Sequence, residues 1–456
     1  MPHRIAICVK SLQEENYPNK IIYKQLNKYA KKFFLLIVPL LLGACSQEAD
    51  IELANSTKTS TTRISLEQAK ANAIDFAMRS KRHTRSNAAV VSVGNAYPVT
   101  AGMNTTRATS NGVSVGDTLF YVINFANNEG FVVAGADTRG EEVYVYVPQG
   151  NYVRNARMVR SNLEIGNTGF DEYMRRLETA ILEIDPTDND IHIKKRQEDD
   201  WTKPKQGAYK PLPDFYKEIG PLLSSEWGQS YPYNKYCPKY CPTGCAITAL
   251  AQACLFVQQP KSFDGIDLDW AAIDKACKKG GFALSNSEEL DRVAKFMRYL
   301  GIQLNANYSP TGTGAKSKDA VAYLHRIGVR ASNLNTYRAH GMDDELLKGG
   351  RIVWMEGCDT RIDRSWLVGD KYEGGHAWLA DGAVTLRKNG KESEYIHINW
   401  GWSSRRDGVG YRDYNGYYSP WVLDSRKEDN QKPTRSNQKG LYQYKIRTST
   451  ISKPNL

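Results

Sequence analysis

The first regular pattern of hydrophobic and polar positions lies between residues 65 and 200. Ser65 and Gln68 have the spacing of a capping box, and apolar residues then recur at helical intervals, which predicts a helix. The apolar positions of this helix are Leu66, Ala69, Ala73, Ile74 and Ala77. A loop of small and polar residues is expected to follow, to about Thr109.

Strand patterns come next. Two apolar runs flank an Asn-Asn-Glu-Gly turn, which predicts a hairpin, and a third run predicts a further strand. The predicted strands are 119–125, 131–136 and 143–147. A second amphipathic helix is predicted with its apolar face from Phe170 to Leu182, and Pro186 ends it. Residues 65–200 therefore predict a small unit of helices and antiparallel strands, and the charged stretch 187–210 has the composition of an exposed, cleavable linker.

A nearly all-apolar run in the second region, 201–456, begins at a cysteine. Proline and glycine break the chain at 242–244, and the apolar residues 246–256 then predict a buried helix that begins at Cys245. Unpaired backbone N–H groups and the positive end of the helix dipole favour a thiolate at that position. Cys245 is therefore the candidate nucleophile. The alternative, a buried cysteine that only packs, suits Cys254 better because Cys254 lies inside the helix.

The candidate base comes from the seven histidines of the chain. His376 follows two glycines and begins a strand-like run, so we expect its ring to be approachable and rigidly held. His397 also lies in a strand pattern and is the second candidate. A surface role is the default interpretation for His325, in a helical pattern, and for His340, in a polar turn.

The segment 395–402 alternates as a strand does. Alternation places Tyr395, His397 and Asn399 on one face and Ile396, Ile398 and Trp400 on the other. We therefore expect Asn399 to accept a hydrogen bond from His376 and to fix its tautomer, with a tryptophan shielding that bond from water.

The N-terminal 45 residues have the order of an export signal. Two lysines precede an apolar run at 33–42, which is about ten residues long and too short to span a bilayer. Small residues then lead into Cys45, an order that resembles a bacterial lipobox with Cys45 as the lipidated residue. A plain secretory signal with an incidental cysteine is the alternative. The polar residues 46–64 predict a flexible spacer.

Composition and charge exclude several classes of function. The chain is 41% hydrophobic and 11% aromatic, which is typical of a globular protein. The net charge of +11 is spread over short basic runs, so nothing but the charge favours a nucleic-acid partner, and none is predicted. Cys237, Cys241 and Cys245 lack the spacing of a zinc site, so we expect no metal or other cofactor. Whether Cys237 and Cys241 form a disulfide is left open.

Four segments of the second region occur in a fixed order: 227–234 (Trp-Gly-Gln-Ser-Tyr-Pro-Tyr-Asn), 243–246 (Thr-Gly-Cys-Ala), 375–377 (Gly-His-Ala) and 399–402 (Asn-Trp-Gly-Trp). Together they resemble the streptopain family of papain-fold cysteine peptidases. His376 and Asn399 follow Cys245 by about 130 and about 150 residues, as the papain-type arrangement expects. The resemblance covers 201–456, and the region 65–200 resembles the family's inhibitory propeptide. It implies an α+β fold, a papain-like peptidase domain preceded by a small helix and antiparallel-sheet propeptide domain.

The resemblance also implies the chemistry. Cys245 would attack a peptide carbonyl of a protein substrate, Gln229 would donate to the oxyanion, and His376 would protonate the leaving amine. Papain has a residue between its Asn and its Trp-Gly, whereas Asn399 and Trp400 adjoin here, so the third catalytic role is left split between them. The propeptide would act as an intramolecular inhibitor, and Cys45 would tether only the precursor to the membrane of a bacterial cell envelope until cleavage released the peptidase.

Two other classes of function are weighed against a peptidase. One is a catalytically silent surface lipoprotein that uses the same fold to bind a partner. The presence of Gln229, Cys245, His376 and Asn399 together disfavours this alternative, because a binding module has no need for all four. The other is a transglutaminase-like transferase, a class that usually completes its triad with Asp rather than with an Asn-Trp pair.

Overall fold

The computed structural model describes residues 62–83, 91–101, 116–153, 168–182, 214–278, 287–339, 342–347, 349–362, 371–388, 391–402, 405–406, 409–410, 414–423 and 444–453. All of these residues belong to one compact unit, Thr62–Leu456. The predicted export signal with Cys45, the linker at 187–210, and His340 lie outside the described residues. No helix within these ranges has both the length and the apolar character that crossing a membrane requires.

The first helix, α3 (Leu66–His83), forms where the capping pattern predicts it. The Ser65 hydroxyl accepts a hydrogen bond from the Gln68 backbone N–H at 3.2 Å. The Gln68 side chain turns forward to Asn72 at 3.1 Å, so only one half of the capping box forms. The apolar stripe of α3, with Phe76 at its centre, is buried against the sheet.

The predicted hairpin and third strand are confirmed as β2 (Thr118–Phe125), β3 (Phe131–Gly135) and β4 (Val143–Val147). A further strand, β1 (Val93–Thr100), pairs with β2 where a loop was expected. That expectation was wrong because Gly94 and Pro98 weaken the strand pattern. The sheet places β1 at its edge, where a proline that cannot donate to a ladder is tolerated.

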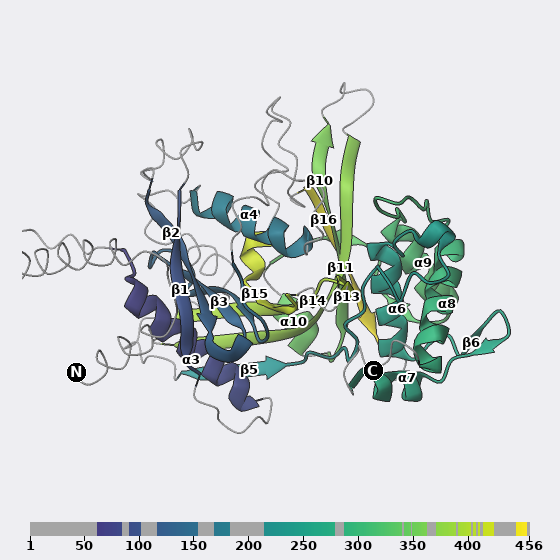
Figure 1. Cartoon of the computed structure of the whole chain (residues 1–456), viewed down its shortest axis with the longest axis horizontal. Coiled ribbons are helices and arrows are strands. Elements are labelled where there is room, and N and C mark those ends of the chain that lie inside the picture. The colour runs from purple at the N-terminus through teal and green to yellow at the C-terminus, as the bar shows by residue number, and fades with distance from the viewer. Residues whose placement is uncertain are drawn as a thin grey trace, which may run out of the picture. The chain divides into compact units, whose positions relative to one another are not determined.

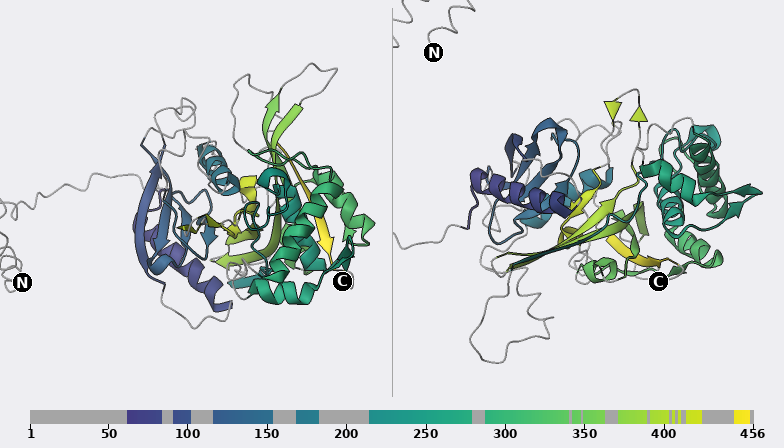
Figure 2. Two further views of the ribbon diagram at one scale, coloured as in Figure 1. Left: turned by 45° about the vertical axis from the view of Figure 1, so that its right-hand side comes forward. Right: turned by 90° about the horizontal axis from the view of Figure 1, so that it is seen from below.

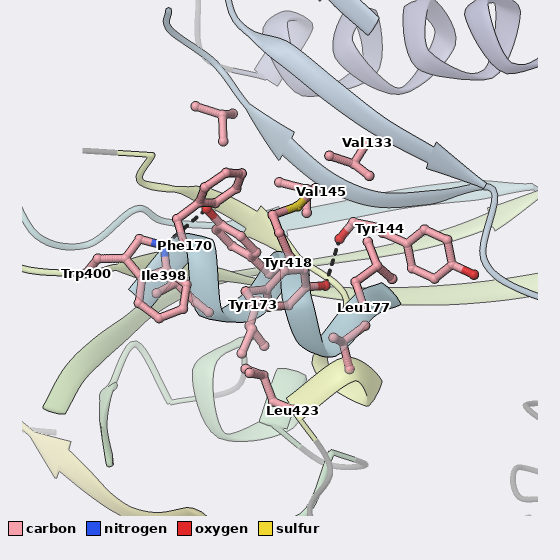
Figure 3. Packing of buried hydrophobic residues seen from close by; sticks show 14 of the residues in the cluster. Val133, Tyr144, Val145, Phe170, Tyr173, Leu177, Ile398, Trp400, Tyr418 and Leu423 are labelled. Atoms are coloured by element: carbon pink, nitrogen blue, oxygen red, sulfur yellow. Dashed lines mark hydrogen bonds between the residues drawn. The ribbon is translucent and has the colours of Figure 1, made fainter. Parts of the chain in front are cut away.

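The second predicted helix is confirmed as α4 (Thr168–Leu182). Its apolar side chains, among them Phe170, Tyr173 and Leu177, are buried against the sheet and against Tyr418 of β15 (Gly416–Tyr418). Figure 3 shows this packing, with Phe170, Tyr173 and Leu177 of α4 beside Val133 and Val145 of the sheet and beside Tyr418 and Trp400.

One sheet runs through both regions. Strand β4 pairs antiparallel with β15, with Tyr146 opposite Tyr417 and Val145 opposite Tyr418. The remaining strands are β5 (Phe215–Ile219), β8 (Arg330–Ala331), β9 (Asn335–Thr336), β10 (Ile352–Ile362), β11 (Lys371–Lys388), β12 (Lys391–Asn399) and β16 (Tyr444–Ser452). The order is β1-β2-β3-β4-β15-β12-β11-β10-β16-β8, with β5 on β11 and β9 on β16. The boundary expected near residue 200 stays a prediction.

Helices cover the C-terminal half of the sheet. They are α6 (Cys245–Val257), α7 (Trp270–Lys278), α8 (Glu288–Gln303), α9 (Ser317–Arg326) and α10 (Met342–Leu347), with short 3-10 turns at Ala126–Asn128, Pro238–Tyr240 and Pro420–Leu423. Two small hairpins are β6 (Ser262–Phe263) with β7 (Ile266–Asp267), and β13 (Arg405–Arg406) with β14 (Val409–Gly410). In Figures 1 and 2 the helices α6 to α9 stand together beside the long strands β10, β11 and β16.

Three groups of buried residues hold the fold. The helical-layer core joins α6 to α9 to one face of β10, β11 and β16, with Leu250, Trp354 and Leu379 among its members. The tryptophan core contains Trp378, Trp400 and the apolar face of α4, and the α3 core packs α3 on β2 to β4, β11 and β12. Helices and a mainly antiparallel sheet sharing these cores confirm the predicted α+β class.

Candidate active site

Cys245 is the first residue of α6, as its sequence context predicted. Gly244 precedes it with a φ of 97°, and a Cβ there would lie 2.7 Å from the Thr313 carbonyl oxygen, so this turn requires glycine. The Cys245 side chain is partly buried against the helical-layer core.

The pKa of the Cys245 thiol is raised, which differs from the expected thiolate. Burial is the largest cause, and the negative charge of Glu356 adds to it. Hydrogen bonds from the backbone of Ala377, Ala246 and Cys245 lower the pKa, as a helix N-terminus should, but they do not outweigh the loss of solvation. In this state the protonated thiol is favoured.

His376 lies in β11 opposite Gly357 of β10 and is only 3% exposed. The neighbouring glycines therefore do not leave its ring open, because tryptophans enclose it. Its ring centroid is 5.6 Å from that of Trp378, 6.4 Å from Trp400 and 5.2 Å from Trp402. The Trp402 indole N–H donates to His376 Nε2 at 2.8 Å.

The protonation state of His376 follows from these surroundings. Burial lowers the pKa of His376 to about 3, and a hydrogen bond with the Trp400 backbone opposes the shift without reversing it. The indole N–H of Trp402 points at Nε2, which must then be an acceptor. The imidazole is therefore neutral in the described state.

The structure brings the two residues to one place. Helix α6 packs against β11, and the backbone of Ala377, the residue after His376, contacts the Cys245 sulfur. The candidate nucleophile and the candidate base thus lie on a helix end and a strand that meet at Ala377.

Gln229 lies on the segment before α6 and is 8% exposed. Its backbone carbonyl accepts a hydrogen bond from the Thr243 N–H at 2.8 Å, which fixes the Gln229 segment close to the nucleophile. The side-chain Nε2 is buried and has no hydrogen-bond partner among the described residues. A buried donor without a partner is unfavourable by about 1–3 kcal/mol, and an oxyanion bound nearby would satisfy it.

The expected hydrogen bond between Asn399 and His376 is wrong. Asn399 lies opposite Leu379, and side chains three residues apart on β11 point to opposite faces, so Asn399 and His376 face away from each other. The Asn399 Oδ1 instead accepts from the Gly401 N–H at 3.2 Å, and its Nδ2 donates to the Ser225 carbonyl at 2.7 Å.

Gln252 is the buried polar residue that sequence reasoning missed. It lies on α6 and is fully buried, and its Oε1 accepts from the Ser225 hydroxyl at 3.0 Å and the Trp227 N–H at 3.1 Å. Its Nε2 and the Asn399 Oδ1 are 3.3 Å apart. A single glutamine in a nearly all-apolar helix was the available signal, because a buried amide requires partners.

His397, the second candidate base, has a structural partner. Its Nδ1 lies 2.6 Å from Asp381 Oδ1, and Asp381 Oδ2 accepts a hydrogen bond from the Leu223 N–H at 2.9 Å. His397 therefore joins β12 to β11 and to the segment before α6. His325 is exposed and contacts the Ala331 carbonyl, in agreement with a surface role.

The other cysteines contribute no disulfide to the described part of the chain. Cys237, Cys241 and Cys254 are buried free thiols. Across the described ranges no three His, Cys, Asp or Glu side chains gather in a way that could hold a metal ion.

Comparisons with known proteins find similarity to cysteine peptidases. Residues 227–411 match the model of the Peptidase C10 family. The "Thiol protease/hemagglutinin PrtT" of Porphyromonas gingivalis is 23% identical over an alignment of 339 residues, and the match covers 65% of this chain and 34% of that protein. The chain thus spans about a third of the length of this curated relative.

Two solved structures from Prevotella intermedia are similar to part of this chain. A prointerpain A fragment is 21% identical with a TM-score of 0.45, covering 74% of this chain and 96% of that one. Active interpain A is 21% identical with a TM-score of 0.33, covering 51% and 94%. The range matched by the family model contains Cys245, His376 and Gln229, and this part of the chain is similar to the Peptidase C10, or streptopain, family of cysteine peptidases.

Proposed function

We propose that the chain is the precursor of a cysteine endopeptidase with Cys245 as nucleophile and His376 as general base and acid. The observation that carries this proposal is the contact between the Cys245 sulfur at the N-terminus of α6 and the backbone of Ala377, next to His376. This arrangement suits acyl transfer, because a thiol at a helix N-terminus and an adjacent imidazole are the parts that a thiolate mechanism needs.

The reaction uses the buried polar groups around the thiol. The Cys245 thiolate attacks the peptide carbonyl, and its own backbone N–H and the Gln229 Nε2 group donate to the oxyanion. One such donor contributes about 3–4 kcal/mol to transition-state stabilisation where it has been measured. His376 then protonates the leaving amine, and water releases the acyl-enzyme.

The third catalytic role falls to Trp400. Its backbone is hydrogen bonded to His376, whereas Asn399 faces the helical layer. Asn399 acts through the chain, because its Oδ1 accepts from the Gly401 N–H at the turn that follows Trp400. Its partner Gln252 links this turn to the helix that carries Cys245.

The described state is an inactive precursor in this proposal. A proton cannot pass readily from a thiol of raised pKa to an imidazole with a pKa of about 3. The enclosed state of His376 involves α4, because the Tyr173 ring packs on Tyr418 and the Tyr418 hydroxyl accepts from Trp400 Nε1 at 3.1 Å. Removal of α4 with the rest of the propeptide would loosen the tryptophans around His376.

The membrane attachment completes the proposal. Lipidation at Cys45 would hold the precursor on the envelope of a bacterial cell, and cleavage in the linker at 187–210 would release the peptidase. Mass spectrometry of the precursor from cells, before and after Cys45→Ser, tests this step. An active peptidase that still carries the lipid on the same polypeptide would contradict it.

The central experiment compares the full chain as wild type, Cys245→Ala and Cys254→Ala under reducing conditions. Chain size and casein hydrolysis are followed together. We expect the wild type and Cys254→Ala to shorten and to digest casein, and Cys245→Ala to do neither while remaining folded by circular dichroism. Hydrolysis by Cys245→Ala at the wild-type rate would contradict the assignment. If the wild type stays inactive even after added protease cuts the linker, the result contradicts the peptidase proposal and favours a partner-binding role.

A further inference from the structure

One face of the strands β10, β11 and β16 packs against the helical-layer core and extends beyond it beside Cys245. Trp354, Leu379 and Ile451 lie on this face and are buried against the helices. Side chains alternate along each strand, so Glu356 on β10 and Ala377 on β11 continue the same face. Glu356 is only partly buried, so the helices no longer cover the sheet there.

The register places Glu356 between the nucleophile and a basic residue. Glu356 is opposite Ala377, whose backbone contacts the Cys245 sulfur, and on its other side it is opposite Arg447 of β16. The strand order β11-β10-β16 then sets the order of the charges. A substrate bound at Cys245 meets the Glu356 carboxylate before it meets the Arg447 guanidinium.

Glu356 and Arg447 form an ion pair that leaves one carboxylate oxygen open. Arg447 Nε donates to Glu356 Oε1 at 2.6 Å, and Arg447 Nη2 contacts the same oxygen. Oε2 of Glu356 has no hydrogen bond to any residue that the structure describes, and the Glu356 and Arg447 side chains are 16% and 44% exposed. The negative charge also acts at the active site, because it raises the pKa of the Cys245 thiol.

A carboxylate can bind two cations, and this chain has an example. Asp291 contacts Lys235 through Oδ1 at 2.6 Å and Lys295 through Oδ2 at 2.9 Å. Glu356 has the same capacity, with Oε1 occupied and Oε2 open.

We propose that Glu356 is a specificity-determining residue that selects a lysine or arginine side chain close to the scissile bond of the substrate. This inference rests on the proposed function, because it requires peptide hydrolysis at Cys245. The Oε2 atom accepts the hydrogen bond of the substrate cation, while Arg447 keeps the carboxylate oriented through Oε1.

The test uses peptides that differ at one position only, with lysine, norleucine or glutamate at each of the positions around the cleaved bond. The measured quantity is the ratio of kcat/KM for the lysine peptide to kcat/KM for the norleucine peptide. This ratio does not depend on how much of the enzyme has matured. We expect the ratio to be about tenfold or more in the wild type at one position, and to fall towards one in Glu356→Gln, as expected for a hydrogen bond to a charged group.

Two further variants make the test specific. Glu345→Gln removes another glutamate that is paired with an arginine, Arg351, on a different part of the surface, and it should leave the ratio unchanged. Arg447→Gln removes the competing cation and should increase the ratio. If Glu356→Gln does not fold, the effect of Arg447→Gln decides.

The outcomes separate this inference from the proposed function. Hydrolysis of all three peptides with a ratio that Glu356→Gln and Arg447→Gln do not change overturns the inference alone. A preference for the glutamate peptide overturns it as well, because the guanidinium would then be the contact. A wild type that cleaves no peptide and no casein overturns the proposed function and the inference together.

Discussion

Cys245 and His376 lie on two differently built parts of the molecule. The helical-layer core behind Cys245 is formed, among the described residues, only by side chains from Leu222 onward. The tryptophan core behind His376 is shared with the N-terminal region, which contributes Phe170, Tyr173 and other side chains of α4 and β2 to β4. The difference shows that the surroundings of Cys245 do not depend on the predicted propeptide, whereas the surroundings of His376 do.

The largest expected effect is a loss of stability in the tryptophan core around His376. Tyr173→Ala removes a ring that is 1% exposed and packs on Tyr418, and it should lower the free energy of unfolding by about 3–5 kcal/mol. Hydrogen exchange of the full chain, with Cys245→Ala to prevent processing, should become faster around residues 399–402 and stay unchanged in α6.

The matched control for this change is Tyr173→Phe. It keeps the ring and loses only the hydroxyl, which donates to the Tyr144 and Ser419 carbonyls, so the loss should be about 1 kcal/mol. Equal loss of exchange protection in α6 and at 399–402 in the alanine variant would show that both sides depend on α4.

The next effect is on the pH dependence of stability. The pKa of His376 is about 3 in the folded chain and about 6.5 when unfolded, so between these values the unfolded chain binds more protons. Stability therefore rises with pH through this window and falls by about 1.4 kcal/mol for each pH unit below 6.5. Urea unfolding of Cys245→Ala at pH 5 and pH 7 measures the slope.

His376→Gln in the same background should remove about 2 kcal/mol of the difference between pH 5 and pH 7. A glutamine does not titrate, so the remaining slope belongs to other groups. If the two proteins lose the same free energy on acidification, His376 is not held neutral by the tryptophan core.

The smallest effect is expected at Gln252, which joins the helix that carries Cys245 to the segment that contains Asn399 and Trp400. Gln252→Leu leaves the Ser225 hydroxyl and the Trp227 N–H without their acceptor, and it should lower the free energy of unfolding by about 1–3 kcal/mol. It should also lower kcat more than it raises KM, because Gln229 and Trp400 lose their relative placement.

Gln252→Glu separates positioning from packing. The carboxylate keeps an acceptor for Ser225 and Trp227 but turns a second oxygen towards Asn399 Oδ1. Protonation of the carboxyl group restores a donor there, so the activity of this variant relative to wild type should recover as the pH falls. An unchanged pH profile of the relative activity would indicate that Gln252 only fills space.

Local patterns were enough for much of the fold and for part of the site. Capping and periodicity predicted α3, α4 and the strands β2 to β4, and the apolar run predicted that α6 begins at Cys245. These features depend on residues close in sequence. Strand β1 was missed because its pairing with β2 outweighs the poor strand propensity of Gly94 and Pro98.

Features that depend on register could not be predicted. Alternation places Asn399 correctly within its own strand, but only the pairing of Asn399 with Leu379 shows that it faces away from His376. The effect of burial could not be predicted either. The helix N-terminus predicts a lowered pKa for Cys245, but the surrounding core raises that pKa.

Because β4 pairs with β15, cleavage of the linker and dissociation of the N-terminal strand and helix would be two separate events. The backbone hydrogen bonds that join Tyr146 to Tyr417 do not require the chain to be continuous between residues 147 and 416. A nick in the linker would therefore give two polypeptides that still share one sheet. The delay before activity appears would be set by the rate at which strand and helix dissociate, and it would shorten on mild heating rather than with more protease.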